Sequence, residues 1–177
     1  MGGVAAAGAA AFVVEPDASS AAVWWTATAL TGGDAWVPGL PRESAQADVA
    51  LLPILQRMGA LLEDGPDGCV RVRGPASLVA PGDVDLGDSP DLLPLVGVLG
   101  AASRGRTTIR GAGHARFKES DRLATVAAGI AALGGRVALE ADRLVVDGGR
   151  LRGGVVRVAG DHRIALAFGA LGLAVPG

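Results

Sequence analysis

The chain carries three short polar segments at equal spacing, Asp17-Ala-Ser-Ser20, Ser89-Pro-Asp-Leu92 and Asp161-His-Arg-Ile164. They begin at residues 17, 89 and 161, so each starts 72 residues after the one before. Each segment precedes an apolar run rich in alanine and leucine, and aspartate or serine at such a position is typical of a helix N-cap. The spacing therefore predicts that the chain consists of repeats, each with a helix that begins at one of these segments.

The same order of elements follows the first two segments. The apolar helix is followed by a short β-branched strand and a polar loop, and a second helix ends at Met58-Gly-Ala60 or Leu133-Gly-Gly135. Strands are then expected around Cys69–Val72 in the first copy and at Val137–Leu139 and Leu144–Val146 in the second. A unit of 72 residues is too long for a solenoid repeat. The pattern therefore predicts a duplicated α/β unit.

The repeat pattern predicts a single domain, residues 1–177, that is divided into three parts. The first copy covers about residues 13–87, the second about 88–154 and a partial third about 155–177. The third copy stops inside its first helix, so we expect the sequence to be a fragment. Half of the 177 residues are hydrophobic, which is sufficient for a substantial core.

Composition excludes several classes of site. The net charge is −2, aromatic residues make up 3% of the chain and basic residues are spread along it, so no nucleic-acid surface is expected. The single cysteine, Cys69, excludes an intramolecular disulfide and a cysteine-based metal site, and we expect it to be a buried thiol in a strand. The two histidines, His114 and His162, lack the spacing of metal ligands, so no metal site is predicted.

No segment has the pattern of a leader or a membrane span. The run Met1–Val14 is rich in alanine and glycine but has no basic residue, so we expect a strand or a domain edge and not a signal peptide. The apolar helices expected at Leu92–Ala102 and Ile164–Leu173 are much shorter than the roughly 20 residues that span a bilayer. We expect them to be buried helices that pack on a sheet.

The polar segments at the helix starts are candidate anion sites. Unpaired backbone N–H groups and the positive end of the helix dipole attract anions at a helix N-terminus. Capping alone explains an aspartate or a serine there, but it does not explain the cationic pair His162-Arg163, which the dipole disfavours unless an anion is bound. If the three helices run in the same direction, one rim gathers the following residues: Asp17, Ser19, Ser20, Ser89, Asp91, Asp161, His162 and Arg163.

A second cluster of charges is Arg116-Phe-Lys-Glu-Ser-Asp-Arg122, directly before a helix expected at about Leu123–Leu133. A solvated loop with internal salt bridges is one interpretation of this cluster. The other is an anion site, in which Lys118 and Arg122 hold the anion and the Glu119 carboxylate gives or takes a proton.

Together, four motifs resemble the 5-enolpyruvylshikimate-3-phosphate (EPSP) synthase family: Asp17-Ala-Ser-Ser20, Ser89-Pro-Asp91, Lys118-Glu-Ser-Asp-Arg122 and Asp161-His-Arg163. The resemblance extends over about residues 13–177 and matches the C-terminal half of that enzyme. It implies an α/β fold in which each of two domains consists of three βαβαββ units, with helices inside and sheets outside. The chain then corresponds to one such domain with its third unit truncated.

The resemblance also implies a reaction. The family transfers the enolpyruvyl group of phosphoenolpyruvate to the 5-hydroxyl group of shikimate 3-phosphate and releases phosphate, in the shikimate pathway of aromatic amino-acid biosynthesis in the cytoplasm. The resemblance implies these two substrates, no organic cofactor and no metal. Its active site lies between two domains, so we expect this chain to be inactive unless a separate chain or a longer parent supplies an N-terminal domain.

The matching motifs imply residue roles. Asp91 matches the carboxylate that binds the shikimate hydroxyl groups and takes the proton of the attacking one, and Glu119 matches the carboxylate that handles the methylene proton. Lys118 matches a lysine near that hydroxyl, and His114 stands where some members carry an asparagine that contacts shikimate 3-phosphate. The arginines that hold phosphoenolpyruvate match Arg122 and Arg163, and the substrate-binding histidine beside the second arginine matches His162. Supporting positions match Asp17, Ser19, Ser20 and Asp161.

Two other interpretations stay open. One is a noncatalytic truncated remnant that at most binds an anion weakly. The other is UDP-N-acetylglucosamine 1-carboxyvinyltransferase, which shares the fold and the phosphoenolpyruvate chemistry. The motifs at Lys118–Arg122 and Asp161–Arg163 favour the EPSP synthase family over this second enzyme.

Overall fold

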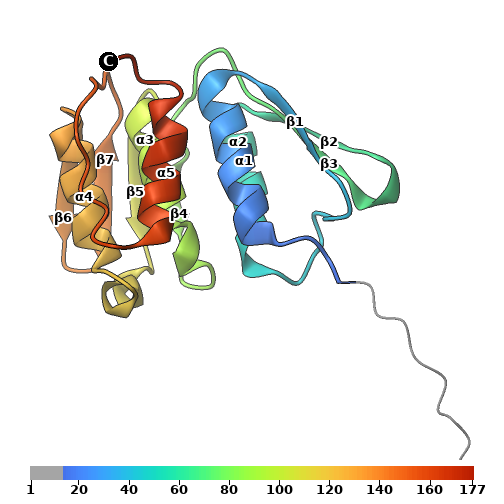
Figure 1. Ribbon diagram of the computed structural model, residues 1–177, viewed down its shortest axis with the longest axis horizontal. Coiled ribbons are helices and arrows are strands. Elements are labelled where there is room, and N and C mark those ends of the chain that lie inside the picture. The colour runs from blue at the N-terminus through green and yellow to red at the C-terminus, as the bar shows by residue number, and fades with distance from the viewer. Residues whose placement is uncertain (1–13) are drawn as a thin grey trace, which may run out of the picture.

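A computed structural model describes residues 14–177 of the chain (Figure 1). The strand or domain edge is expected at Met1–Val14, and residues 1–13 of that range lie outside the described residues. None of the helices within residues 14–177 is both long and apolar enough to cross a membrane.

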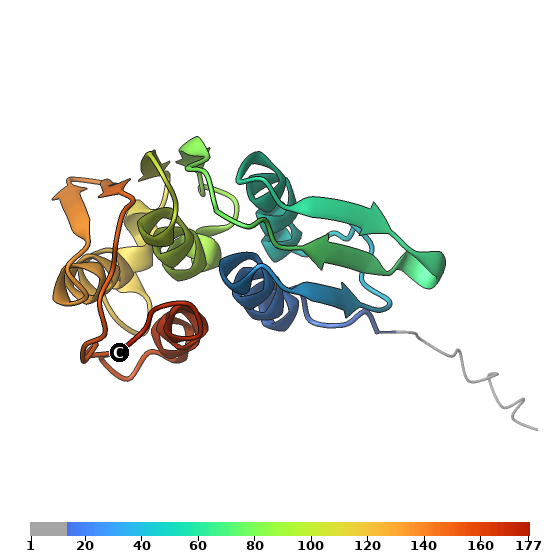
Figure 2. The same ribbon diagram turned by 90° about the horizontal axis from the view of Figure 1, so that it is seen from above.

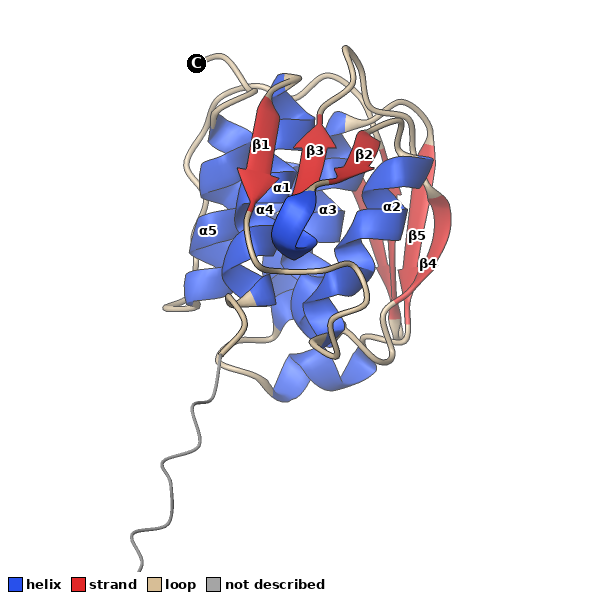
Figure 3. Cartoon of the chain, turned by 90° about the vertical axis from the view of Figure 1, so that its right-hand side faces the viewer, coloured by secondary structure: helices blue, strands red, loops and turns tan. Residues whose placement is uncertain are grey.

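The first part of the chain forms a helix pair against a three-stranded antiparallel sheet. Helix α1 starts after the capping Asp17, and Gly32 ends it with a left-handed φ of 66°, a conformation that favours glycine. Figure 3 looks onto the sheet, which has the strand order β1-β3-β2 and lies in front of α1. The elements are α1 (Ala18–Thr31), β1 (Asp34–Val37), α2 (Leu51–Arg57), β2 (Leu61–Asp64) and β3 (Val70–Arg73).

The second part repeats this order with one additional strand. Its four-stranded sheet has the order β4-β5-β7-β6, in which β5, β7 and β6 are antiparallel neighbours, as β1, β3 and β2 are in the first sheet. The predicted duplication of helix, strand, helix and two strands is therefore present in the structure. The elements are β4 (Gly82–Asp85), α3 (Leu93–Ala102), β5 (Arg106–Arg110), α4 (Arg122–Ala132), β6 (Arg136–Glu140) and β7 (Arg143–Asp147).

Strand β4 has no counterpart among the predicted strands. It pairs in parallel with β5, with Val84 opposite Ile109. Val84 is the only buried residue of this strand, and acidic side chains flank it, so the apolar alternation typical of a strand is too short to recognise. It also precedes residue 88, where we expected the second copy to begin, so the second sheet includes residues that the repeat pattern assigned to the first copy.

Helix α5 (His162–Gly172) packs against α1 and α3, which also contact each other (Figure 2). Their N-termini all lie at the lower end in Figure 1. Helix α3 is the most enclosed, since every residue from Leu93 to Ala101 is buried, and a helix that is apolar on all sides belongs in a core. Leu166 on α5 and Leu173 directly after it are exposed.

The prediction for Cys69 is wrong. The residue is half-buried and ends a short 3₁₀ turn, Pro66–Gly68, so it precedes β3 and is not a buried thiol within a strand. The strand begins one residue later, at Val70, whose side chain is buried. The apolar pattern indicated the strand correctly, but the turn that places Cys69 at its edge depends on Gly68, which adopts a left-handed φ of 69°.

Close packing between α4 and α5 predicts the effect of one substitution. A Cβ atom on Gly129 of α4 would lie 2.3 Å from Cζ of Phe168 on α5, which is closer than packed atoms allow. We expect Gly129→Ala to lower the free energy of unfolding by about 1–3 kcal/mol through overpacking. Gly169→Ala is the matched control, because its Cβ meets no atom within 4 Å and alanine favours a helix. Urea unfolding of both variants tests this, and a destabilised Gly169→Ala variant would contradict it.

Candidate active site at the helix N-termini

Two of the predicted N-caps are formed by aspartate side chains. Asp17 accepts hydrogen bonds from the backbone N–H groups of Ser19 (3.0 Å) and Ser20 (3.1 Å) at the start of α1. Asp161 caps α5 by accepting from the backbone N–H of Arg163 at 3.0 Å. Capping fixes these two carboxylates at the helix ends, where unpaired N–H groups and the dipole favour negative charge.

The third helix start is organised differently. A 3₁₀ turn, Pro90–Leu92, precedes α3, and Ser89 makes no side-chain capping bond and is buried. Asp91, in the middle of this turn, faces the same space as the other two helix starts. The residues around this hollow of about 200 Å³ are Asp17, Ser19, Ser20, Val23, Asp91, Leu95, His162, Arg163 and Leu166. Residues from all three helix starts therefore line this hollow, as expected, but two of the residues predicted for the rim, Ser89 and Asp161, are buried and do not line it.

Arg122 is a cation of the site that is almost fully buried. It is the first residue of α4, and its side chain is 1% exposed. Its Nε donates to Asp161 at 2.8 Å and its Nη1 to Asp91 at 2.7 Å. Its Nη2 donates to Glu119 at 2.5 Å. A buried guanidinium group without partners would be strongly destabilising, so these three carboxylates stabilise it where it lies.

Arg163 connects the starts of α1, α3 and α5. Its Nη2 lies 3.1 Å from Oδ2 of Asp91 and donates to Oγ of Ser19 at 3.2 Å. Its Nη1 donates to Oδ2 of Asp48 at 3.3 Å. The arginine is therefore held at the rim by two carboxylates, although it lies at the positive end of a helix dipole.

The remaining predicted residues lie at different distances from this centre. Lys118 Nζ is 3.5 Å from Oδ1 of Asp91, and both Lys118 and Glu119 are exposed. His162 is exposed and lines the hollow. His114 is exposed in the 3₁₀ turn Gly113–Phe117 and does not line it.

One polar residue of the site was missed in the sequence. Asp48 lies in a 3₁₀ turn, Ala47–Ala50, before α2, and it is buried beside Ser19 and Arg163. No motif marks it, since it stands alone in a polar loop. The one available signal is that it directly precedes the apolar run of α2, where an aspartate is also an ordinary cap.

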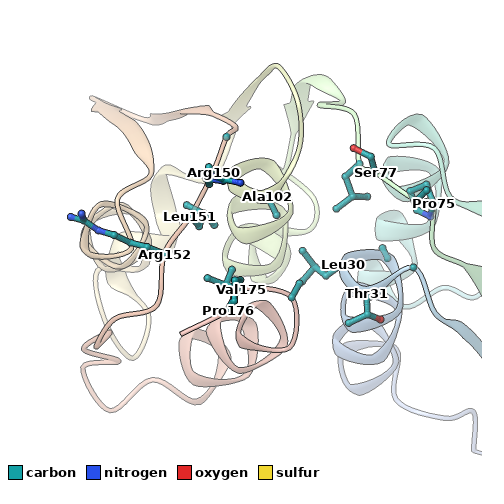
Figure 4. A pocket seen from close by; sticks show the side chains of 16 residues that line it. Leu30, Thr31, Pro75, Ser77, Ala102, Arg150, Leu151, Arg152, Val175 and Pro176 are labelled. Atoms are coloured by element: carbon teal, nitrogen blue, oxygen red, sulfur yellow. The ribbon is translucent and has the colours of Figure 1, made fainter.

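A larger hollow, about 820 Å³, lies at the opposite end of the helices (Figure 4). Leu30 and Thr31 line it from the end of α1, and Val175 and Pro176 from the segment after α5. None of the predicted site residues is part of it. The candidate active site is therefore the smaller hollow, where the charged residues converge.

Comparison with known proteins identifies the family. The model of the family described as EPSP synthase (3-phosphoshikimate 1-carboxyvinyltransferase) matches residues 1–177. The chain belongs to the EPSP synthase family. The family consists of enolpyruvyl transferases of the shikimate pathway.

Individual members of the EPSP synthase family show the extent of the match. The 3-phosphoshikimate 1-carboxyvinyltransferase of Methanothermobacter thermautotrophicus is 44% identical over 162 residues, which is 92% of this chain and 38% of that protein. The enzyme of the same name from Methanospirillum hungatei is 40% identical over 159 residues, which is 90% of this chain and 37% of that protein. The EPSP synthase structure from Acinetobacter baumannii superposes with a TM-score of 0.78 at 26% identity, over 93% of this chain and 41% of that chain. The chain thus spans about two fifths of the length of these relatives.

The charges of the site alter the pKa values of two of its aspartates, Asp91 and Asp161. Burial raises the pKa of Asp91, but the charges of Arg163, Lys118 and Arg122 together outweigh it, so its pKa lies below the ordinary value. Burial likewise raises the pKa of Asp161, and hydrogen bonds from Arg122 and Ser120 more than compensate, so this pKa is lowered as well. Both groups are therefore carboxylates at neutral pH in this EPSP synthase family member.

The acidic and histidine side chains of the described residues do not form a metal centre at this site. Among residues 14–177, no cluster of three or more His, Cys, Asp or Glu side chains has a geometry that could hold a metal ion. The carboxylates Asp91, Glu119 and Asp161 all face the same guanidinium group, that of Arg122. The arrangement is therefore chemically suited to hold anions with its cations and to move protons with its carboxylates.

The buried ion pair between Arg122 and Asp161 predicts a large stability effect. Asp161→Ala removes the cap of α5 and one carboxylate from a buried guanidinium group, so we expect the free energy of unfolding to fall by about 3 kcal/mol. Asp147→Ala is the control, because Asp147 pairs with Arg106 on the exposed surface and its loss should have a much smaller effect. Urea unfolding monitored by tryptophan fluorescence compares them, and equal losses would contradict this prediction.

The lowered pKa of Asp161 predicts how that stability effect depends on pH. A folded-state pKa below the ordinary 3.8 means that the stabilisation is fully present above 3.8 and is lost as pH falls through the folded-state pKa. We therefore expect the difference in unfolding free energy between the unmodified chain and Asp161→Asn to shrink as the pH falls from 6 to about 3. Unfolding curves measured across this range check the trend, and a difference that grows towards acid pH would refute it.

Proposed function

We propose that this chain supplies one half of the active site of a 3-phosphoshikimate 1-carboxyvinyltransferase. The observation that carries the proposal is the meeting of Asp91 with Lys118, Arg122 and Arg163 at the rim formed by three helix starts. These residues belong to the motifs that resemble the family, and the family model matches the whole chain. The proposed substrates are therefore shikimate 3-phosphate and phosphoenolpyruvate.

The charges of the rim suit these two substrates. Both carry phosphate and carboxylate groups, and Arg163 presents a planar fork of donors at a helix start that also favours anions. Lys118 offers a second exposed cation near Asp91. In the proposed arrangement, Arg163 and His162 hold phosphoenolpyruvate, while Lys118 and His114 face shikimate 3-phosphate. The guanidinium N–H groups of Arg122 donate to three carboxylates, so Arg122 contacts phosphoenolpyruvate only if one of these carboxylates gives up its hydrogen bond.

The proposed reaction is an addition followed by an elimination. Asp91 takes the proton of the 5-hydroxyl group, whose oxygen attacks the central carbon of phosphoenolpyruvate, and Glu119 delivers a proton to the methylene carbon. A tetrahedral adduct results. A proton then leaves the new methyl group for Glu119 as the carbon–oxygen bond to the phosphate breaks, which restores the double bond. The proton that Asp91 took passes to the departing phosphate, so both carboxyl groups return to their starting states.

A carboxylate with a lowered pKa is a weak base, so Asp91 acts as a base only if bound substrates raise its pKa. Without them, Arg163, Lys118 and Arg122 stabilise its carboxylate and make it a weak base. Anionic substrates bring negative charge to Arg163 and Lys118, which weakens the pull of these cations on Asp91. Substrate binding is therefore expected to raise the pKa of Asp91 and so make proton transfer to it easier.

The proposal requires a second half of the site. The chain spans about two fifths of the length of its relatives, so an N-terminal domain is expected to close the hollow and provide further cations. We also infer that the chain consists of two βαβαββ units, at about residues 13–87 and 88–154, and part of a third unit at about 155–177. Strand β4 departs from these bounds, because it lies before residue 88 but pairs with β5 of the second sheet.

A complementation assay tests the proposed function. The chain is mixed with the separately expressed N-terminal domain of the Methanothermobacter thermautotrophicus relative, and phosphate release is measured. The mixture is tested once with this chain as it is, and once with this chain extended by the segment that follows the matched region in that relative. We expect turnover of phosphoenolpyruvate and shikimate 3-phosphate only in the mixture. Asp91→Asn should lower kcat by about 10²–10⁴-fold through loss of the base. Asp83→Asn, an exposed aspartate on β4, is the control and should have no effect.

The other interpretations give different results in the same assay. A mixture of folded parts without turnover in either arrangement would support a noncatalytic remnant and reject the proposal. Turnover that requires UDP-N-acetylglucosamine in place of shikimate 3-phosphate would identify the other enolpyruvyl transferase. Activity that survives in Asp91→Asn would reject the role of this residue.

A further inference from the structure

Asp48 is a buried carboxylate that the proposed chemistry does not use. It is 6% exposed, and it lies between the first turn of α1 and the first turn of α5. Its Oδ2 accepts a hydrogen bond from Oγ of Ser19 at 2.5 Å and one from Nη1 of Arg163 at 3.3 Å. A carboxylate is buried at low cost only when such partners neutralise it, so its position depends on Arg163 and the position of Arg163 depends on it.

The loop that carries Asp48 is anchored to the start of α1. Gln46 accepts a hydrogen bond from the backbone N–H of Ala18 at 2.8 Å and donates to the carbonyl of Pro16 at 2.9 Å. The backbone around Asp48 is therefore held by the same helix end that contributes Ser19 to the hollow. Asp48 is a fixed partner for Arg163, whereas the long arginine side chain is the member of the pair that can move.

Arg163 has two carboxylate partners on different sides. Asp91 lines the hollow and lies near Nη2, whereas Asp48 does not line the hollow and accepts from Nη1. If Asp91 were the sole carboxylate partner, the guanidinium group would be held by this ion pair alone. With Asp48 present, one end of the guanidinium group remains bound while the other is able to exchange Asp91 for an incoming anion.

We propose that Asp48 is a positioning residue, which holds the Arg163 guanidinium group at the rim of the hollow so that an anion binds it without prior ordering. The benefit is a lower entropic cost of binding, because the arginine is already immobilised. This inference rests on the proposed function only in identifying the anion as a substrate. The immobilisation of Arg163 by Asp48 is a property of the chain alone.

NMR of the complete chain tests the proposal directly. In the unmodified chain, the Arg163 Nη–H signals should be resolved and exchange slowly with water, because Nη1 and Nη2 are the donors in these contacts. Asp48→Asn keeps the size and an acceptor oxygen but removes the charge, and it should accelerate this exchange by at least about tenfold. Ser19→Ala leaves the Asp48–Arg163 ion pair in place and should retain slow exchange. Asp64→Asn is the matched control, since it removes a carboxylate from the exposed pair with Arg42.

Titration with inorganic phosphate and with phosphoenolpyruvate gives the second readout. We expect Asp48→Asn to raise the dissociation constant about tenfold while Asp64→Asn leaves it unchanged, and the thermal midpoint of each variant shows whether it is folded. Unchanged Arg163 exchange and unchanged affinity in folded Asp48→Asn would overturn the proposal. So would a freely rotating Arg163 guanidinium group in the unmodified chain, whether or not the variant folds.

The two proposals fail in different ways. If no protein binds phosphate or phosphoenolpyruvate, but Arg163 is immobile in the unmodified chain and mobile in Asp48→Asn, the positioning role holds and the proposed function is weakened. If complementation succeeds while Asp48→Asn retains immobile Arg163 and the same KM for phosphoenolpyruvate, the positioning role is rejected and the proposed function stands. A raised KM with little change in kcat supports both.

Discussion

The arrangement of the site depends on the burial of one guanidinium group, that of Arg122. A charged group removed from water is tolerated only when it is paired, and Arg122 binds carboxylates from three separate segments. Glu119 lies three residues before the start of α4, Asp91 lies in the turn before α3, and Asp161 caps α5. The ion pairs that stabilise the arginine therefore also determine where the helix starts lie relative to one another.

The same principle applies to the cation at the rim. Arg163 lies at the start of α5, where the helix dipole disfavours positive charge, and it is compensated by Asp48 and Asp91. A site in which each cation already has a carboxylate partner is assembled before any ligand arrives. Binding of an anion is then an exchange of partners, which costs less than ordering free side chains.

Local patterns predicted much of the fold and part of the site. The N-caps at Asp17 and Asp161, the ends of the helices and the duplicated order of elements depend on residues that are near one another in the chain, so the sequence reveals them. Strand β4 was missed because one buried residue, Val84, does not make a pattern. Cys69 was misplaced because a turn at Gly68 shifts it to the edge of the strand.

The sequence by itself determined the repeat, the starts of the helices in each copy and the family motifs that mark Asp91, Glu119 and Arg122. Only the tertiary structure decided which charges meet. Asp48 and Arg163 are 115 residues apart, and their contact exists because α1 and α5 pack side by side with their starts at the same end. Periodicity and capping report the neighbours of a residue along the chain, whereas a buried ion pair depends on how distant helices pack together.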